Sequence, residues 1–563
     1  MPKNEWSMIG PSTDQKAKNL LFTLGQRGLF PLAIYIAFFC LLTWPLILRF
    51  SSHFFTDTGD GLQNVWNVWW VNKAVTELHR LPWSTTYLHF PHGSTLLAHT
   101  LNPFNGFLGI AFLRFLSLTQ AFNLIIIFSF AVGGLTAFLL AYHFSRSYWG
   151  SLLAGFVFTF SNYHFTHAEG HLQLVALEWI PLFILVWFVF VKKPSIGRGL
   201  ASALALFAVI LCDYYYFFYC VLAAVLIVFW KMIREKDMFF LFRRSRVFPL
   251  LTFLAGVLLT SAPLVVALVL LNLRNPLAGW HDPKFYSLDL LAAFIPGGHW
   301  RFASLTECYW SRLPGNIHEN SVHIGLSLVF VLVYVWLRRK KIQEATLTLW
   351  YGVLALFVIL SLGPVLHVWG RELSWVKLPY ALLEFIFPPL RMSGVPVRMM
   401  VMVMLGASVI AAIGAREIMA SGRKTKWLAL LIVALLLFEY LPKPMPATRI
   451  PVPEYVKFLK RLPAGRGLID LVADPSKSLY YQTFHQRPLA FGYIARVPMS
   501  VEKRNQRIRN LIGDLEFNLL YRSYHFRYLV VEGRALSSTP KAYLRLLFDD
   551  GEVRIYELGA GLE

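Results

Sequence analysis

Long apolar runs recur along this 563-residue chain, and they constrain its fold more than any other feature. Eleven of them, several of them short, are candidates for the roughly 20 residues that a helix needs to cross the hydrocarbon core of a bilayer. Because 15% of the residues are charged and 56% are hydrophobic, a soluble enzyme and a disordered chain are both excluded. We predict a polytopic α-helical membrane protein with about eleven transmembrane helices. The runs are Leu29–Leu48, Phe122–Tyr142, Tyr148–Tyr163, Leu172–Val191, Leu200–Leu211, Tyr214–Trp230, Val247–Leu271, Val322–Leu337, Leu347–Val365, Val397–Ile413 and Trp427–Tyr440.

The segment Leu200–Trp230 decides the predicted topology. A single helix of that length would run about 46 Å, too long for one crossing, and would carry Asp213 near its middle. We therefore predict a hairpin that turns at Asp213. With an inside N-terminus, the cytoplasmic pieces then hold 22 Lys and Arg in 78 residues, against 11 in 160 on the other side. This bias satisfies the positive-inside rule, whereas a single span would export the six basic residues of 231–246.

The domain boundaries follow from this topology. Residues 1–28 form a cytoplasmic tail, residues 29–441 the transmembrane domain with a long first outer loop at 49–118, and residues 442–563 an extracytoplasmic domain. The last of these alternates β-like runs with helical patterns, which predicts a small α/β domain. The β-like runs are Gly467–Val472, Tyr528–Val531 and Val553–Leu558, and one helical pattern is Pro453–Arg461.

The net charge of +22 would suggest nucleic acid as a partner of a soluble protein. Here most of the excess falls in cytoplasmic loops, so membrane lipids are the expected partners and nucleic acid is not. Leu29–Leu48 lacks a convincing cleavage site and reads as a signal anchor. The predicted location is a bacterial inner membrane, with the N-terminus cytoplasmic and the C-terminal domain periplasmic or extracellular.

The first outer loop opens with two carboxylates, Asp57 and Asp60, followed by the tryptophan-rich segment Leu62–Leu78. An amphipathic helix of this kind is expected to lie in the plane of the membrane interface. Asp60 can cap the N-terminus of that helix, which is an alternative to a chemical role, whereas Asp57 has no such structural explanation. A carboxylate held just outside the bilayer is suited to general-base chemistry, so both residues are candidate catalytic groups.

An inside N-terminus, one span, and an acidic pair opening a long first outer loop with an interfacial helix resemble the layout of the GT-C glycosyltransferases. These multispan enzymes use polyprenyl-phosphate-linked sugars and include oligosaccharyltransferases and protein mannosyltransferases. This chain has Asp57-Thr-Gly-Asp60 where many members have adjacent Asp and Glu. The strings Phe55–Trp70, His171–Leu182 and Tyr480–Pro488 also resemble uncharacterised bacterial membrane proteins described only as glycosyltransferases.

The resemblance implies inverting transfer of a hexose or pentose from a polyprenyl-phosphate donor at the outer face of the membrane. The acceptor would be a glycan, a lipid or a protein, and Asp57 or Asp60 would be the base. The alternative is a transporter or flippase of a lipid-linked or anionic substrate, which should show polar residues at the midplane and an internal repeat. A third interpretation is a scaffold whose outer domain binds cell-wall polymer.

The second outer loop concentrates histidines and one carboxylate. His164, His167 and Glu169 are candidate ligands of a divalent metal, although a hydrogen-bonded, aromatic-rich helix turn would give the same pattern. GT-C relatives often place a second acidic element at this point, so the resemblance favours Glu169 or His171 as a contact to substrate. The sequence requires no other cofactor.

The third and fourth outer loops supply the remaining candidates for substrate binding. Glu319 ends the third loop and either faces substrate or caps the next span. Arg398 lies just inside an apolar run, where a lone charge needs a partner. Guanidinium geometry suits a phosphate, so we predict a donor-phosphate clamp of Arg398 with Arg391 or Lys377. Snorkelling to headgroups is the alternative for Arg391.

Overall fold

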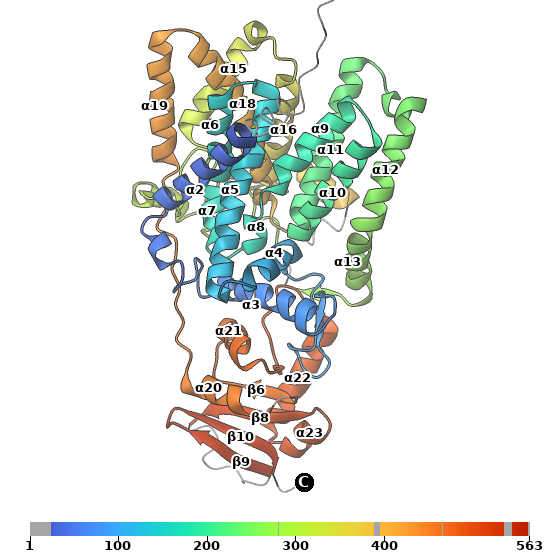
Figure 1. The fold of residues 1–563 in the computed structure, drawn as a ribbon, viewed down its shortest axis with the longest axis vertical. Helices are drawn as coiled ribbons and strands as arrows, with labels where there is room; N and C mark the ends of the chain where they lie inside the picture. The colour runs from blue at the N-terminus through green and yellow to red at the C-terminus, as the bar shows by residue number, and fades with distance from the viewer. Residues whose placement is uncertain (1–23, 280, 388–393, 464, 534–542, 561–563) are drawn as a thin grey trace, which may run out of the picture.

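The computed structural model describes residues 24–279, 281–387, 394–463, 465–533 and 543–560. A helical bundle forms one end of the molecule and a sheet with its helices forms the other (Figure 1). The helix α3, which lies in the first outer loop, sits between them. The first outer loop, which carries the acidic pair, therefore lies between the two ends and contacts both.

A helix covers the greater part of each of the eleven predicted apolar runs. The run Leu172–Val191 is interrupted at residues 176–178, and Val247–Leu271 is divided into two helices bent by 45°. The helices are α2 (Phe30–Leu42), α5 (Leu118–Ser145), α6 (Tyr148–Thr159), α8 (Leu172–Val175), α9 (Trp179–Lys192), α10 (Ile196–Cys212), α11 (Tyr214–Glu235), α12 (Arg244–Thr260), α13 (Ala262–Arg274), α15 (Leu326–Ile342), α16 (Leu347–Ser361), α18 (Met400–Ala420) and α19 (Arg423–Glu439).

Four helical segments of the described chain are long and apolar enough to cross a membrane, and the bent pair α12–α13 makes five. The four are Gly25–Leu42, Leu118–Ser145, Tyr214–Glu235 and Pro396–Ala420. The chain is thus a multi-pass membrane protein by its helices, while the count of eleven crossings stays a prediction.

The predicted hairpin at Asp213 is confirmed. Helix α10 ends at Cys212 and α11 begins at Tyr214. The Asp213 carboxylate accepts hydrogen bonds from the backbone N–H groups of Tyr215 (2.7 Å) and Tyr216 (3.2 Å), the N-cap geometry that starts a new helix.

Helix α18 is the centre of the bundle, and its apolar window is completely buried. It packs against α5, α6, α15 and α16, whereas α12 and α13 lie at the periphery and every residue of α13 is at least partly exposed. The outer side of the pair α12–α13 is therefore not covered by other helices of the described chain.

Helix α3 (Asp60–Asn72), predicted as an amphipathic helix in the plane of the membrane interface, is enclosed by protein. All residues from Gly61 to Val71 are buried. The rings of Trp66 and Trp70 stack at 5.7 Å, and the Trp66 indole N–H donates to Gln482 Oε1 at 2.6 Å. Its apolar surface is covered by α4 (Pro103–Leu113) and α21 (Pro475–His485), so the tryptophans face protein.

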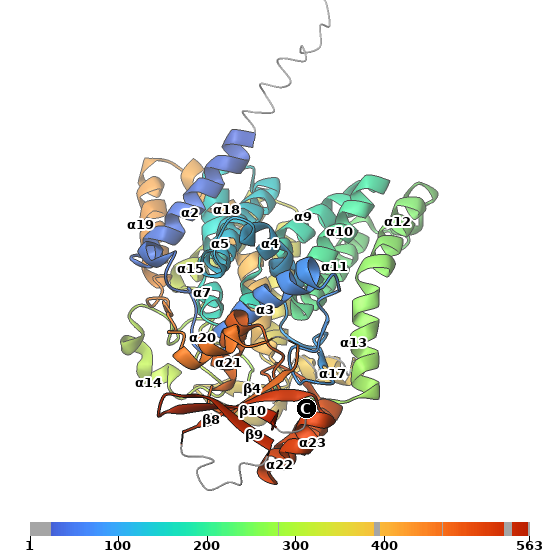
Figure 2. The ribbon, with the colours of Figure 1, turned by 60° about the horizontal axis from the view of Figure 1, so that its bottom comes forward.

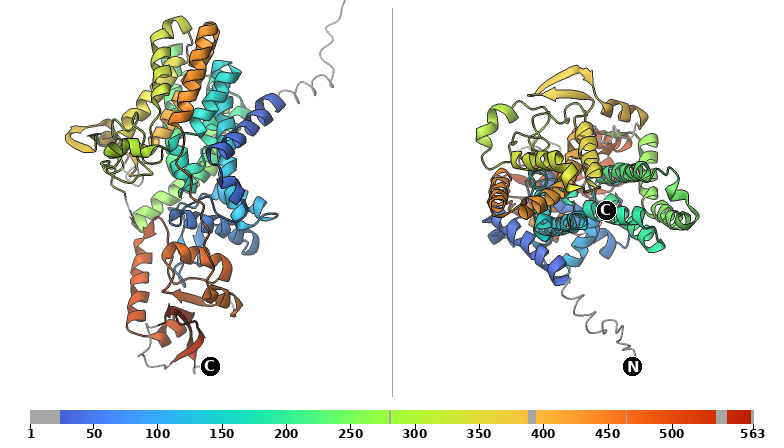
Figure 3. Two further views of the ribbon diagram at one scale, coloured as in Figure 1. Left: turned by 90° about the vertical axis from the view of Figure 1, so that its left-hand side faces the viewer. Right: turned by 90° about the horizontal axis from the view of Figure 1, so that it is seen from above.

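Short elements complete the outer loops. A two-residue antiparallel pair, β1 and β2, follows α3, and the hairpin of β4 and β5 projects from the side of the molecule (Figure 3). Their bounds are β1 (Ser84–Thr85), β2 (Ser94–Thr95), α7 (Asn162–Ala168), β3 (Leu277–Ala278), α14 (Glu307–Trp310), β4 (Val365–Val368), β5 (Arg371–Lys377) and α17 (Pro379–Ile386).

The C-terminal part contains a four-stranded mixed sheet with the order β6-β8-β10-β9, in which β6 and β8 are parallel and the other neighbours antiparallel. Figure 2 brings this sheet and its helices forward. The strands β6, β8 and β10 coincide with the predicted β-like runs. The elements are α20 (Glu454–Arg461), β6 (Gly467–Asp470), β7 (Val497–Pro498), α22 (Met499–Gly513), α23 (Phe517–Arg522), β8 (Phe526–Glu532), β9 (Tyr543–Asp549) and β10 (Val553–Ala560).

One strand leaves this arrangement. Strand β7 pairs antiparallel with β3, which follows α13, and the paired residues are Leu277 with Pro498 and Ala278 with Val497. The C-terminal part is thus hydrogen-bonded to the end of the peripheral helix pair.

Candidate active site

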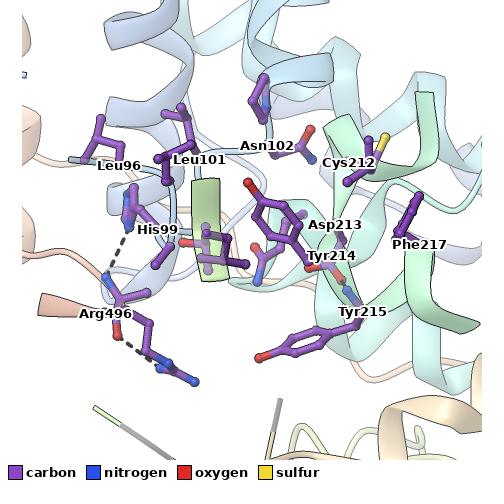
Figure 4. A pocket seen from close by; sticks show the side chains of 18 of the residues that line it. Leu96, His99, Leu101, Asn102, Cys212, Asp213, Tyr214, Tyr215, Phe217 and Arg496 are labelled. Atoms are coloured by element: carbon purple, nitrogen blue, oxygen red, sulfur yellow. Dashed lines mark hydrogen bonds between the residues drawn. The ribbon is translucent and has the colours of Figure 1, made fainter. Parts of the chain in front are cut away.

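A cavity of about 490 Å³ lies among α3, α11, α13 and the C-terminal segment that precedes α22. Figure 4 shows side chains of the first outer loop, of α11 and of this segment around it. Part of the lining is apolar: Leu264, Val265, Leu268 and Val269 of α13, with Phe217 and Phe218 of α11. Another part is polar: Asp60, His99, His171, Asp213, His281, Arg398, Tyr493 and Arg496.

Asp57 closes the turn before α3. Its Oδ1 atom accepts hydrogen bonds from the backbone N–H groups of Gly59 and Gly61, both at 2.9 Å, and its own N–H donates to the carbonyl of Glu169 at 2.7 Å. The structural role that the sequence suggested for Asp60 therefore belongs to Asp57. Burial raises the pKa of Asp57, so its carboxylate is a stronger base than an ordinary aspartate.

The second oxygen of Asp57 lies against a backbone without a side chain. A Cβ atom placed on Gly170 would come within 2.6 Å of Asp57 Oδ2. Glycine at position 170 thus lets the second outer loop approach the carboxylate. Among the described residues, Oδ2 makes no backbone hydrogen bond of the kind that holds Oδ1.

Asp60 is the first residue of α3 and lines the cavity. Its Oδ1 accepts a hydrogen bond from the Tyr493 hydroxyl at 2.6 Å, and Oδ2 lies 3.4 Å from His171 Nε2. Burial alone would raise the pKa of Asp60, but the hydrogen bonds from His171 and Tyr493 lower it. Asp57 and Asp60 therefore differ in electrostatics, with Asp60 the weaker base.

The second and third outer loops meet beside the acidic pair and form two groups of potential metal ligands. One consists of His167, His171 and Glu319, the other of Glu169, His299 and His318, and the ligand atoms within each lie within 4.8 Å of one another. Either donor set, two imidazoles with one carboxylate, suits a divalent metal.

His164 corrects the predicted metal set of His164, His167 and Glu169. Its ring nitrogens lie 2.7 Å and 2.8 Å from the carbonyl oxygens of Thr159 and Val175, and its ring stacks on Phe130. These contacts make His164 a core residue. The sequence prediction was wrong because the spacing of histidines along a helix does not show which ring points into the core. His167 and Glu169 fall in separate groups.

Arg398 is paired rather than free. Its Nε lies 3.0 Å from Glu319 Oε1 and its Nη2 lies 2.5 Å from the same atom, and the guanidinium stands 5.1 Å from the Tyr215 ring centroid. Arg398 is 7% exposed. Glu319, predicted to contact substrate, is thus the partner that this buried charge requires.

The other predicted cations do not join this pair in the described chain. Lys377 is exposed at the end of the projecting β5 and lies outside the cavity lining. Arg391 falls outside the described residues. The predicted clamp of Arg398 with one of these residues is therefore not assembled around the cavity by the described residues.

Sequence reasoning missed His299, Tyr493 and Arg496. His299 Nε2 lies 3.1 Å from Glu169 Oε2, and the two others reach the cavity from the C-terminal part, more than 400 residues after Asp60. None belongs to a recognisable motif, so their only signal is the proximity that folding creates.

Replacing Gly170 by Ala is expected to lower the free energy of unfolding by about 1–3 kcal/mol, because the added methyl would overlap the Asp57 carboxylate. Thermal unfolding of the purified chain in detergent measures this. The matched control is Gly513→Ala, where a Cβ meets nothing within 4 Å. Equal melting temperatures for both variants would show that the contact is not tight.

Comparison with known proteins identifies a family and a similar fold. The family described as Domain of unknown function (DUF6311) matches residues 32–438. No curated protein matches the chain. The arabinofuranosyltransferase AftD from Mycobacteria superposes with a TM-score of 0.54 at 14% identity, over 94% of this chain and 41% of AftD, so this chain spans about two fifths of that protein.

Two further solved structures align over most of this chain with TM-scores below 0.5. They are the oligosaccharyltransferase AglB from Archaeoglobus fulgidus (0.42, 12% identity, 92% of this chain and 70% of AglB) and ArnT from Cupriavidus metallidurans (0.41, 13% identity, 93% and 97%). The match to AftD shows a GT-C-type fold, which confirms the resemblance seen in the sequence, and at this identity it shows the fold alone.

Proposed function

The chain belongs to the family described as Domain of unknown function (DUF6311), and for it we propose transfer of a sugar from a polyprenyl-phosphate-linked donor to an acceptor at the outer face of the membrane. The acceptor is a glycan, a lipid or a protein. The shared fold with an arabinofuranosyltransferase supports this proposal.

The observation that carries the proposal is the mixed lining of the cavity. An amphiphilic donor presents an isoprenoid chain, a phosphate and a sugar, and the cavity offers apolar residues of α13 beside Asp60, His171 and two arginines. Its volume is of the size that binds small ligands. The peripheral position of α12 and α13 gives the isoprenoid a route from the bilayer.

Asp57 lies beside the cavity, which Asp60 and Gly170 line. In the proposed reaction the Asp57 carboxylate removes the proton of an acceptor hydroxyl at the edge of the cavity. The acceptor oxygen attacks the anomeric carbon on the face opposite the phosphate, the new glycosidic bond forms as the bond to the phosphate oxygen breaks, and polyprenyl phosphate leaves with the electron pair. Direct displacement predicts inversion at the anomeric carbon. A divalent cation held by either histidine–carboxylate group would neutralise phosphate charge.

The pH dependence of transfer should reveal Asp57. A general base acts only when deprotonated, so the rate falls as pH falls through its pKa. An ordinary aspartate has a pKa of about 3.9. Because burial raises the pKa of Asp57, the fall in rate is expected at a pH above that value. The measurement is the initial rate with saturating donor across pH. A rate that stays constant into that ordinary range would exclude Asp57 as the titrating base.

The test of the function uses the full chain in nanodiscs, a panel of polyprenyl-phosphate hexoses and pentoses, and a crude cell-envelope acceptor mixture. Mass spectrometry follows free polyprenyl phosphate and the glycosylated acceptor. Acceptor-dependent release supports the proposal. A folded chain that releases nothing from any donor would overturn it, and movement of labelled lipid across liposomes would then identify the transporter or flippase alternative.

A further inference from the structure

The segment Gly492–Pro498 of the C-terminal part lines the cavity with Tyr493, Ala495 and Arg496 and is bonded to three separate elements. The Tyr493 hydroxyl donates to Asp60, the Ala495 N–H donates to His99 Nδ1 at 3.1 Å, and β7 pairs with β3. The Gln63 side-chain amide adds a hydrogen bond to the Tyr493 carbonyl at 3.0 Å. A segment held at this many points presents its side chains in a defined position.

Arg496 belongs to this segment and lines the cavity. The hydrogen bond described for its guanidinium runs from Nη1 to its neighbour's carbonyl, that of Ala495, at 3.0 Å. Within the described ranges, no Asp or Glu forms an ion pair with it. Figure 4 shows Arg496 and Tyr215 on different walls of the pocket, one from the C-terminal segment and one from α11.

The charge of Arg398, in contrast, is already balanced. Glu319 holds it bidentately, and Asp213, a second carboxylate, also lines the cavity. A phosphate that approached Arg398 would meet these carboxylates as well. Arg496 is the other arginine of the lining, and its charge is not balanced by a carboxylate among the described residues. Of the histidines in the lining, burial lowers the pKa of His99 to about 3 and that of His281 to about 4, while His171 lies against the Asp60 carboxylate at 3.4 Å.

We propose that Arg496 binds the phosphate of the polyprenyl donor, so that the C-terminal part completes the donor site. The inference rests on the proposed function for the identity of the donor. A guanidinium can bind phosphate oxygens through two parallel hydrogen bonds, which an ammonium cannot reproduce. Arg398 then serves to hold Glu319 and the third outer loop in place.

The experiment measures binding of polyprenyl phosphate, the reaction product, and of the uncharged polyprenol to the full chain in nanodiscs. Variants are Arg496→Gln, Arg496→Lys and the control Arg507→Gln, an exposed arginine of α22. Arg496→Gln is expected to weaken the binding of polyprenyl phosphate about 10- to 100-fold, because a charge-assisted hydrogen bond to phosphate is lost. The binding of polyprenol should be unchanged. Arg496→Lys should recover part of this loss, and the control should match wild type.

An equal loss for both lipids in Arg496→Gln, or unchanged phosphate binding, would overturn the assignment. Thermal unfolding of each variant separates either result from misfolding. Failure of the assignment is distinct from failure of the function: sugar transfer with unaltered donor KM in Arg496→Gln refutes the role of Arg496 alone. If the chain binds polyprenyl phosphate in preference to polyprenol through Arg496 but transfers no sugar, the result supports the phosphate site and refutes the proposed transfer reaction.

Discussion

Replacement of Asp57 by Asn is expected to reduce the release of polyprenyl phosphate by about 10²- to 10⁴-fold, the usual contribution of a general base. The amide preserves the shape of the side chain, and its oxygen can still accept the hydrogen bonds from Gly59 and Gly61. Loss of activity would therefore report the missing basicity rather than an altered turn. Mass spectrometry of the lipid product measures the effect.

Two matched variants make this result specific. Asp60→Asn should reduce the release of polyprenyl phosphate less than Asp57→Asn does, because the lowered pKa of Asp60 makes it the poorer base. Asp514→Asn changes an exposed aspartate after α22 and should retain full activity. If Asp60→Asn abolished the release of polyprenyl phosphate while Asp57→Asn retained it, the general base would be Asp60 and not Asp57.

Replacement of Glu319 by Gln is expected to lower the free energy of unfolding by about 3–5 kcal/mol. The variant leaves the Arg398 guanidinium buried without its counter-charge, and an unpaired buried charge is costly. Unfolding in detergent, followed by tryptophan fluorescence, measures the loss.

The control for this variant is Glu307→Gln, an exposed glutamate of the same outer loop, which should unfold like wild type. The double variant Glu319→Gln with Arg398→Met should regain part of the lost stability, because it removes the stranded charge. A double variant no more stable than Glu319→Gln alone would show that the ion pair is not the cause.

Much of the membrane part could be predicted from the sequence because its determinants are local. A carboxylate in the middle of an overlong apolar run predicted the turn at Asp213, and the same depth argument required a partner for Arg398. The approximate helix positions follow from apolar runs for the same reason.

The candidate site was less predictable because it depends on contacts between distant segments. The cap before α3 comes from Asp57 instead of Asp60, since the turn through Gly59 and Gly61 brings their N–H groups back to it. No periodicity distinguishes an inward-facing His164 from a ligand. Tyr493 and Arg496 reach the cavity only through tertiary folding.

The burial of α3 also has a consequence for biosynthesis. Trp66 and its partner Gln482 are 416 residues apart in the chain. At a synthesis rate of about 5–20 residues per second, the first outer loop waits roughly 20–80 s before the helix that covers it has been made. During that interval a tryptophan-rich helix has no α21 to shield it. Residues 442–563 therefore cover the first outer loop only after they have been made, and a chain that ends before α21 would expose the tryptophans of α3 to quality-control proteases.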